Sequence, residues 1–385
     1  MRIAWVIYGS LEQQTGGTIY DARVVDGLTR AGDEVHVVSL EDGDLPHAAH
    51  GFARTLPPIA RVATMAKAGF ALARRIQELD PEVVVGDELC FRELGIAFRR
   101  LGPWAQRAHG ARRARRARRV LLVHHLTAWE LELSPLRRRV VRAAERFAID
   151  ASDAVIVTSR TTRERLVSEG VRERIEVVLP GADRLSRSES ESESRSGSES
   201  RSGSDVRFVV LGAVVGRKRV LEVVRAFASG APRDERLAIV GSTTRDVAYV
   251  ASVREEIARL GLGERVVMDG EVDEAGVARA LARADVLVMP STLEGYGIAA
   301  TEAIHAGVPV IAARAQGLEE ALAPCPDATI FADDENALAV AIDRFAHDHA
   351  LRAAMTEAAR RASPLMPTWA SCADAFRAAL TALTA

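Results

Sequence analysis

One stretch of thirty residues, ADVLVMPSTLEGYGIAATEAIHAGVPVIAA at positions 284–313, constrains the fold more than any other part of the chain. Its short apolar runs, its glycines and its proline predict alternating buried strands and turns. We expect a strand at Val286–Met289, a turn at residues 294–297, a helix at residues 298–306 and a second strand at residues 308–312. A strand, loop, helix and strand in this order predict a parallel α/β sheet.

The turn in this stretch has the chemistry of a binding loop. Gly295 and Gly297 lie where the strand passes into the helix, so backbone N–H groups can approach a ligand closely, and the helix N-terminus favours an anion. Glu294 and Glu302 add carboxylates that can accept hydrogen bonds from sugar hydroxyls. The combination suits a sugar attached to a diphosphate. In the alternative interpretation, Glu294 only compensates the helix dipole and Glu302 is a solvated side chain.

The string E-G-Y-G-x4-E followed by A-G-V-P-V-I-A resembles the signature of the family 4 retaining glycosyltransferases, in which two glutamates are separated by seven residues. The resemblance implies a GT-B fold, with two Rossmann-like α/β domains facing each other across a cleft. It implies transfer of a sugar from a nucleoside-diphosphate sugar to an acceptor. The anomeric configuration of the sugar is retained, and no metal or other cofactor is required. It also implies that Glu294 orients the sugar hydroxyls, that Glu302 orients the ribose hydroxyls, and that the diphosphate meets the backbone of Gly295, Tyr296, Gly297 and Ile298.

Length and composition limit the classes of protein to consider. A chain of 385 residues is long enough for two domains, and 48% hydrophobic with 27% charged residues is typical of a soluble globular protein. The net charge of −2 gives no general attraction to nucleic acid. Three widely spaced cysteines form neither a disulfide framework nor a zinc site. The sequence has no signal peptide and no apolar run of the ~20 residues that span a bilayer, so we expect a cytoplasmic protein.

The beginning of the chain predicts another parallel strand–helix–strand unit. We expect a strand at residues 3–8, a glycine turn containing Gly16 and Gly17, a helix at residues 20–31 and a strand at residues 35–40. The G-x-G-x-x-G fingerprint of dinucleotide binding is absent. Gly16 and Gly17 instead resemble the first-loop glycines with which GT-B transferases approach the donor phosphate. The alternative is a tight turn without a ligand.

Two adjacent histidines end the strand expected at residues 120–124. Open parallel sheets bind ligands at this end of their strands. The stretch VHHLTAWEL resembles the V-H-H-x-x-x-x-E stretch of one branch of the family, and this resemblance implies that His124 faces the transferred sugar. His125 is the alternative, because neighbouring strand residues point to opposite faces. A lone histidine is more often structural than catalytic.

A strongly basic run extends from Arg112 to Arg119 in Ala-Arg-Arg triplets, and three more arginines follow at positions 137–139. Its arginines could attract an anionic membrane by about 1 kcal/mol each, or bind an acidic acceptor. Nucleic-acid binding is less favoured, because no aromatic side chains are interleaved with the arginines. A solvated face is the alternative.

A polar segment separates the two halves of the chain. The sequence SRSESESESRSGSESRSGSD contains no bulky apolar residue, so we expect a disordered Ser/Glu/Arg linker at residues 185–205. This boundary predicts an N-terminal Rossmann-like acceptor-side domain at residues 1–184 and a C-terminal donor domain at residues 206–365. Residues 366–385 resemble the terminal helix that crosses back to the first domain in the family.

The first loop of the second half is basic. GAVVGRK resembles the G-x-V-x-P-R-K-G donor loop of the family, and Ala213 stands where the more common form of that loop has arginine. Arg217 is the candidate replacement, and Lys218 is the candidate catalytic cation that neutralises the departing diphosphate. The chain contains only one other lysine, Lys67. A solvated helix start is the alternative interpretation.

Other classes of protein remain as alternatives. An oxidoreductase on a similar frame is disfavoured by the missing fingerprint, and a sugar-nucleotide epimerase by the spacing of the two glutamates. A non-catalytic GT-B protein that binds a nucleotide sugar remains open because of Ala213. The D-x-D sequence at Asp42-Gly43-Asp44 lies away from the expected donor loops, and we interpret it as an acidic turn without a metal.

Overall fold

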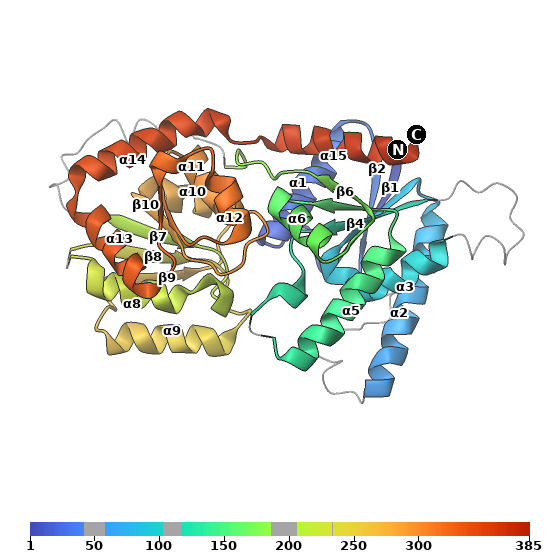
Figure 1. Ribbon diagram of the computed structural model, residues 1–385, viewed down its shortest axis with the longest axis horizontal. Coiled ribbons are helices and arrows are strands. Elements are labelled where there is room, and N and C mark those ends of the chain that lie inside the picture. Colours follow the sequence, from blue (N-terminus) through green and yellow to red (C-terminus); the bar gives the residue numbers. More distant parts are fainter. Residues whose placement is uncertain (42–57, 103–116, 132, 186–205, 233) are drawn as a thin grey trace, which may run out of the picture. The chain divides into compact units, whose positions relative to one another are not determined.

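The computed structural model describes residues 1–41, 58–102, 117–131, 133–185, 206–232 and 234–385 (Figure 1). These residues form two compact units. The first contains Met1–Gln13, Gly17–Leu179 and Ala370–Ala385, and the second contains Gln14–Gly16 and Pro180–Trp369. Each unit is built around its own parallel sheet.

The first unit has a parallel sheet in the order β2-β1-β3-β4-β5-β6. Its central strands are buried along nearly their whole length, as expected of a sheet with helices on both faces. The strands are β1 (Arg2–Ile7), β2 (Glu34–Ser39), β3 (Val83–Asp87), β4 (Arg118–Val123), β5 (Ala154–Val157) and β6 (Arg174–Val177).

Helices of the first unit include one from the end of the chain. The helices are α1 (Gly16–Arg30), α2 (Pro58–Leu79), α3 (Phe91–Leu101), α5 (Pro135–Ala151), α6 (Arg160–Ser168) and α15 (Trp369–Thr384), with short 3-10 turns at Glu88–Cys90 and Thr127–Trp129. The ring of Phe376 in α15 lies 5.3 Å from that of Trp5 in β1. Arg377 donates to Asp33 at 2.7 Å. The last helix therefore packs on the first sheet.

The second unit repeats the architecture, with the sheet order β12-β11-β10-β7-β8-β9. Its strands are β7 (Arg207–Leu211), β8 (Arg236–Val240), β9 (Val266–Gly270), β10 (Val286–Met289), β11 (Val310–Ala312) and β12 (Thr329–Phe331). Its helices are α8 (Val220–Gly230), α9 (Val247–Arg259), α10 (Glu274–Arg283), α11 (Ile298–His305), α12 (Gln316–Leu322), α13 (Glu335–His347) and α14 (His349–Ala362). Short 3-10 turns lie at Gly216–Lys218, Pro326–Ala328 and Ser363–Leu365.

Two apolar cores lie on the two faces of this second sheet. Phe208 and Val210 of β7 belong to one core, whereas Val209 and Leu211 belong to the other. This division follows from the alternation of side chains along a strand. The carboxyl ends of the strands are thus held rigidly between two packed layers.

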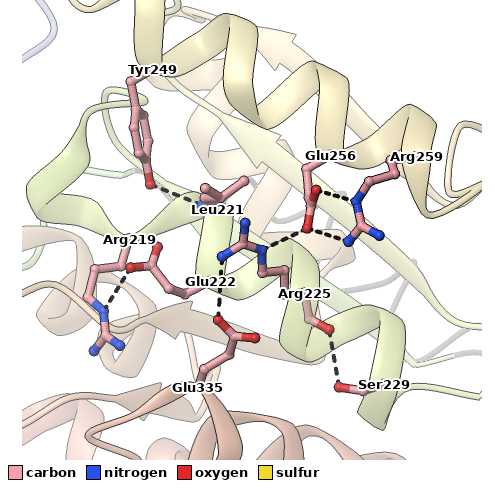
Figure 2. A network of polar contacts seen from close by, with 9 residues as sticks. All are labelled: Arg219, Leu221, Glu222, Arg225, Ser229, Tyr249, Glu256, Arg259 and Glu335. Carbon is pink, nitrogen blue, oxygen red and sulfur yellow. Dashed lines mark hydrogen bonds and ion pairs between the residues drawn. The ribbon is translucent and has the colours of Figure 1, made fainter.

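A network of charged side chains fixes α8, the helix that follows the basic loop (Figure 2). Arg219 begins the helix in a left-handed conformation, with φ of +55°, and its guanidinium reaches Glu222. Arg225 pairs with Glu256 of α9 at 2.7 Å and with Glu335 of α13 at 3.9 Å. Exposed pairs of this kind add little stability individually. Together they tie α8 to both of its neighbouring helices.

Several sequence expectations agree with these elements, and others are corrected. The strand Val286–Met289 has the predicted bounds, and the following helix ends one residue earlier than predicted. The first helix begins at Gly16 rather than at residue 20, so Gly16 and Gly17 form its first turn instead of a separate loop. β4 ends at Val123, which places His124 immediately after the strand.

Some predictions concern residues outside the described part of the chain. These are the acidic turn Asp42-Gly43-Asp44, nearly all of the polar linker (residues 186–205), and the basic run from Arg112 to Arg116. Among the described helices, none combines the length and the apolar character needed to cross a bilayer.

Candidate functional site

Lys218 and Glu294 form a close ion pair in the second unit. Lys218 ends the turn after β7, and Glu294 belongs to the loop after β10, the neighbouring strand. The Lys218 Nζ atom lies 2.5 Å from Glu294 Oε1, and the two side chains are only 14% and 10% exposed. Gly212 lies beside this lysine, and its φ of +128° is a backbone conformation that favours glycine. Both residues are candidates from the sequence, and the structure brings them together.

Arg217 joins the same two loops and adds a second cation. Its Nη1 atom donates to the carbonyl of Leu293 at 3.2 Å and lies 3.8 Å from Glu294 Oε1. Its own carbonyl accepts from the N–H of Thr292 at 2.9 Å. Burial alone would raise the pKa of Glu294, but Lys218 and Arg217 lower it below its ordinary value. Two cations beside one carboxylate leave a positive charge that an anion can neutralise.

The expected diphosphate loop ends at the N-terminus of α11. Gly297 is the N-cap residue, with φ of +107°, and Ile298 is the first residue of the helix. α12 packs tightly against this loop, because a Cβ atom at Gly317 would lie 2.4 Å from the carbonyl oxygen of Gly295. Tyr296 is buried beside it. The first N–H groups of a helix have no partner within the helix, so this end favours an anion.

Glu302 is buried in α11, which excludes the interpretation of a solvated side chain. Its carboxylate is held by Arg184 through two bonds, Nε to Oε1 at 2.6 Å and Nη2 to Oε2 at 3.0 Å. Sequence reasoning did not find Arg184. Its only signal is its position directly after P-G-A-D, the string that closes the first domain in the family.

His124, in the first unit, lies in a buried cluster of acids. Its Nε2 atom is 3.6 Å from Asp87 Oδ2 and 3.8 Å from Asp21 Oδ1. Its backbone N–H donates to Glu88 Oε2 at 3.0 Å. All four side chains are buried. Among the described residues, Asp21, Asp87 and His124 form a group that could hold a metal ion, since their ligand atoms lie within 4.8 Å of one another.

The first turn of α1 fixes the histidine ring. A Cβ atom at Gly17 would lie 3.2 Å from His124 Cδ2, so this glycine lets the ring pack against the helix backbone. Tyr20, one turn along, meets the ring edge-on with centroids 5.2 Å apart. Gly16 is the first residue of the same helix. His125 has a different partner: its Nε2 atom lies 3.6 Å from Glu130 Oε1.

Two of the acids near His124, Asp21 and Glu88, have raised pKa values. Burial and the nearby Asp87 carboxylate raise the pKa of Asp21 to about 7. Burial also raises the pKa of Glu88 well above its ordinary value. For His124, burial opposes the charged form, but the surrounding carboxylates raise its pKa well above the usual range. We infer that this cluster holds protons at neutral pH.

Sheet topology would have revealed part of this cluster. Asp87 ends β3 and Glu88 follows it, and β3 is hydrogen-bonded to β4, the strand that leads to His124. Parallel neighbours present their carboxyl ends at one sheet edge, so these acids could be expected near the histidine. Asp21 lies within α1, and its sequence context gives no such signal.

One residue of the basic run is unavailable for surface binding. Arg119, in β4, is buried and forms a bidentate pair with Asp153, with distances of 2.9 Å and 2.7 Å. Its third contact is the carbonyl of Phe98. The expectation that Arg119 contributes to a membrane or acceptor contact is therefore wrong, because a buried side chain with these partners is structural.

Comparison with known proteins covers both units. The profile described as "Glycosyl transferases group 1" matches residues 192–362, and "Glycosyltransferase Family 4" matches residues 15–184. A GDP-mannose-dependent alpha-(1-6)-phosphatidylinositol monomannoside mannosyltransferase from Mycolicibacterium smegmatis is 32% identical over 273 residues, covering 68% of this chain and 67% of the relative. Other curated relatives are matched over about half of their own length or less.

Solved structures with low sequence identity share the fold. Sucrose-phosphate synthase from Thermosynechococcus elongatus has a TM-score of 0.78 at 20% identity, with 99% of this chain and 98% of that chain covered. The Anabaena protein Alr3699/HepE, solved in complex with UDP-glucose, has a TM-score of 0.73 at 17% identity, with 99% and 100% covered. These likenesses confirm the predicted architecture of two Rossmann-like α/β domains.

Proposed function

Because this chain belongs to the family 4 glycosyltransferases and has the GT-B fold, we propose that it transfers a sugar, with retention, from a nucleoside-diphosphate sugar to an acceptor hydroxyl. The observation that carries the proposal is the pairing of Lys218 with Glu294, beside Arg217 and the N-terminus of α11. These groups come from the positions at which the family signature matches this sequence. A metal or other cofactor is not part of the proposal.

The reaction breaks the bond between the anomeric carbon and the diphosphate oxygen, so negative charge develops on the departing diphosphate. Lys218, Arg217 and the backbone N–H groups at the start of α11 are arranged to stabilise that charge before the reaction begins. Glu294 keeps Lys218 in position and would accept hydrogen bonds from the sugar hydroxyls. We assign no covalent nucleophile.

His124 is proposed to contact the transferred sugar, and this role rests on the family motif. The geometry of the first unit adds that its Nε2 atom faces Asp21 and Asp87, so the ring is held in one orientation. Electrostatic positioning by neighbouring carboxylates is a common way to fix a histidine for function.

A panel of nucleotide sugars tests this proposal. Ligand at one hundred times its dissociation constant stabilises the folded protein by about 2.7 kcal/mol, enough to raise the melting temperature measurably. We expect UDP-, GDP- or ADP-sugars to raise it for the wild type. Lys218→Ala and Glu294→Ala should remove this shift, whereas Lys67→Ala, which changes the exposed second lysine, should not.

Release of nucleoside diphosphate, measured on the same samples with candidate acceptors, separates an enzyme from a binding protein. Loss of a preorganised charge partner in an active site typically lowers the rate by 100-fold or more, and we expect this for Lys218→Ala. A thermal shift without nucleotide release would support the non-catalytic alternative. No shift with any donor would overturn the proposal.

We further propose that the protein contacts anionic membranes through the solvent side of α5. Leu136 and Val140 are 75% and 63% exposed, and Leu131, just before the helix, is 73% exposed. Leu136 and Val140 are one helical turn apart, and Arg137 and Arg139 lie on the exposed surface beside them. Large apolar side chains flanked by arginines suit the interface of an anionic bilayer.

Vesicle sedimentation tests this contact. We expect the protein to pellet with phosphatidylcholine vesicles only when these contain phosphatidylglycerol, and to be released by salt. The double variant Leu136→Ser/Val140→Ser should pellet several-fold less. Val340→Ser, at an exposed valine of α13 in the second unit, is the matched control. Equal pelleting of the double variant and the control would contradict this proposal.

A further inference from the structure

Three elements of the first unit bring metal-binding side chains together. Asp21 lies in α1, Asp87 ends β3, and His124 directly follows β4. His124 Nε2 lies 3.6 Å from Asp87 Oδ2 and 3.8 Å from Asp21 Oδ1. One imidazole nitrogen and two carboxylate oxygens, each from a different element, therefore face one another, and all lie within 4.8 Å.

The facing atoms of Asp21 and His124 lack hydrogen bonds. Both carboxylate oxygens of Asp21 and the Nε2 atom of His124 are buried, and they have no hydrogen-bond partner within the described part of the chain. The separations of 3.6 and 3.8 Å are too long for hydrogen bonds between these side chains. A buried carboxylate without hydrogen bonds is costly. These oxygens therefore point to a ligand that carries positive charge.

The excess of acid around the ring favours a divalent cation. Glu88 adds a third buried carboxylate, whose Oε2 atom accepts from the backbone N–H of His124 at 3.0 Å. Within the described ranges of the chain, none of the three acids pairs with a lysine or an arginine. One imidazole cannot balance three carboxylates, whereas a divalent cation would neutralise Asp21 and Asp87. Without a metal ion, protons offset part of the same charge.

The spacing and the type of ligand select the cation. Ligand atoms at about 2.0–2.1 Å from a tetrahedral Zn²⁺ are roughly 3.4 Å apart. Neighbouring ligand atoms of an octahedral Mg²⁺ are roughly 3.0 Å apart. The distances of 3.6 and 3.8 Å from His124 Nε2 are closer to the tetrahedral value. Imidazole also suits Zn²⁺, whereas Mg²⁺ and Ca²⁺ select oxygen ligands.

We propose that Asp21, Asp87 and His124 form a Zn²⁺ site in the first unit. The Asp87 carboxylate is already oriented for it, because Oδ1 accepts from the N–H of Leu89 at 2.6 Å while Oδ2 faces the histidine. The His124 side chain is 11% exposed, so the ion can enter beside it and a water molecule can complete the four ligands. The ion takes no part in sugar transfer. It joins α1, β3 and the end of β4, and it holds the His124 ring in place.

Calorimetric titration of the full chain, first freed of metal with a chelator, tests the site. We expect one Zn²⁺ to bind per chain, and Mg²⁺ at the same concentrations should not bind. Loss of a group that only supports a metal ligand lowers affinity by about 10- to 100-fold, so Asp21→Asn and Asp87→Asn, which remove a ligand, should lower it by at least about 100-fold. His125→Ala is the matched control, because it changes the adjacent imidazole, which pairs with Glu130. It should bind Zn²⁺ as the wild type does.

A variant that exchanges one ligand protects the test against misfolding. Asp21→Cys replaces an oxygen ligand by a thiolate, which Zn²⁺ and Co²⁺ both accept, so it should retain the metal. With Co²⁺, which absorbs visible light in tetrahedral sites, this variant should add a thiolate-to-cobalt absorption band that requires direct coordination. Wild-type protein that binds no Zn²⁺, or binds Mg²⁺ in its place, would overturn the proposal. Wild-type affinity in both asparagine variants would instead identify an adventitious surface site, and it would overturn the proposal equally.

Discussion

The two units bury their charges in different ways. In the second unit, each carboxylate of the family signature has its own cation, since Glu294 pairs with Lys218 and Glu302 with Arg184. In the first unit, three buried acids surround one imidazole; they are Asp21, Asp87 and Glu88 around His124. In the second unit every one of these carboxylates is paired with a cation, whereas the cluster of the first unit has an excess of acid.

This difference determines how each cluster responds to pH. A buried acid beside its own cation stays ionised, and the lowered pKa of Glu294 shows this effect. Acids that share one cation cannot all ionise without repulsion, and the pKa of Asp21 accordingly rises to about 7. The second unit therefore presents a constant electrostatic field to an anion, whereas the first unit exchanges protons within the physiological range.

The largest expected effect comes from replacing Asp21, one of the buried acids around His124. The pKa of folded Asp21 lies above its ordinary value of 3.8, so its neutral form stabilises the fold at low pH, and this contribution is lost as the pH rises through about 7. The loss amounts to on the order of 4 kcal/mol at most between pH 4 and pH 8. Asp21→Asn cannot ionise, and its melting temperature should exceed that of the wild type by several degrees more at pH 8 than at pH 5.

Asp33→Asn is the matched control for this pH series. Burial raises the pKa of Asp33, but Arg377 and the N-terminal ammonium lower it below its ordinary value. Its stabilising contribution is therefore complete above pH 5 and is lost only in acid. Asp33→Asn should melt below the wild type by the same amount at pH 5 and pH 8. If the melting temperatures of the Asp21 and Asp33 variants, relative to the wild type, changed with pH in the same way, the proposed contrast in pH response would be contradicted.

A smaller effect is expected from displacing the imidazole without changing any charge. In Gly17→Ala, the new methyl group would come within 3.2 Å of His124 Cδ2, so the ring must give by a few tenths of an ångström and its position relative to Asp21 and Asp87 changes. A misplacement of a functional group can lower kcat/KM by up to about 100-fold, and we expect about tenfold here. Nucleotide release measures the change.

Gly263→Ala provides the control for this substitution, because no atom lies within 4 Å of a Cβ atom at that position. It should retain wild-type kcat/KM and melting temperature. If Gly17→Ala also retained wild-type kcat/KM while remaining folded, the position of the His124 ring would not matter for transfer.

The secondary structure around the candidate site of the second unit could be predicted well from the sequence. The bounds of Val286–Met289, the turn containing Gly297 and the helix after it follow from short-range patterns of apolar residues and glycines. Lys218 and Glu294 were identified as separate motifs, 76 positions apart, and the fold brings them together. Periodicity and turn chemistry are local properties, and the sequence contains them directly.

The Arg184–Glu302 pair and the acid cluster could not be predicted in the same way. Arg184 and Glu302 are 118 positions apart, and a buried arginine has no sequence pattern that separates it from the many exposed ones. Asp21 is an acid within α1, and only the packing of α1 against the end of β4 shows that it is buried. Long-range pairing depends on tertiary packing, which motif spacing does not contain.

The order of strands in the second sheet has a consequence for how such a protein can diverge. From β7 the chain runs outward through β8 and β9, and it then returns to β10 on the other side of β7 and continues to β11 and β12. Lys218 and Glu294 follow the two strands at this reversal, which is the place where open parallel sheets commonly bind ligands. Mutational drift in the outer helices can therefore proceed for long periods without separating these two loops, because the strand connectivity rather than any particular side chain places them side by side.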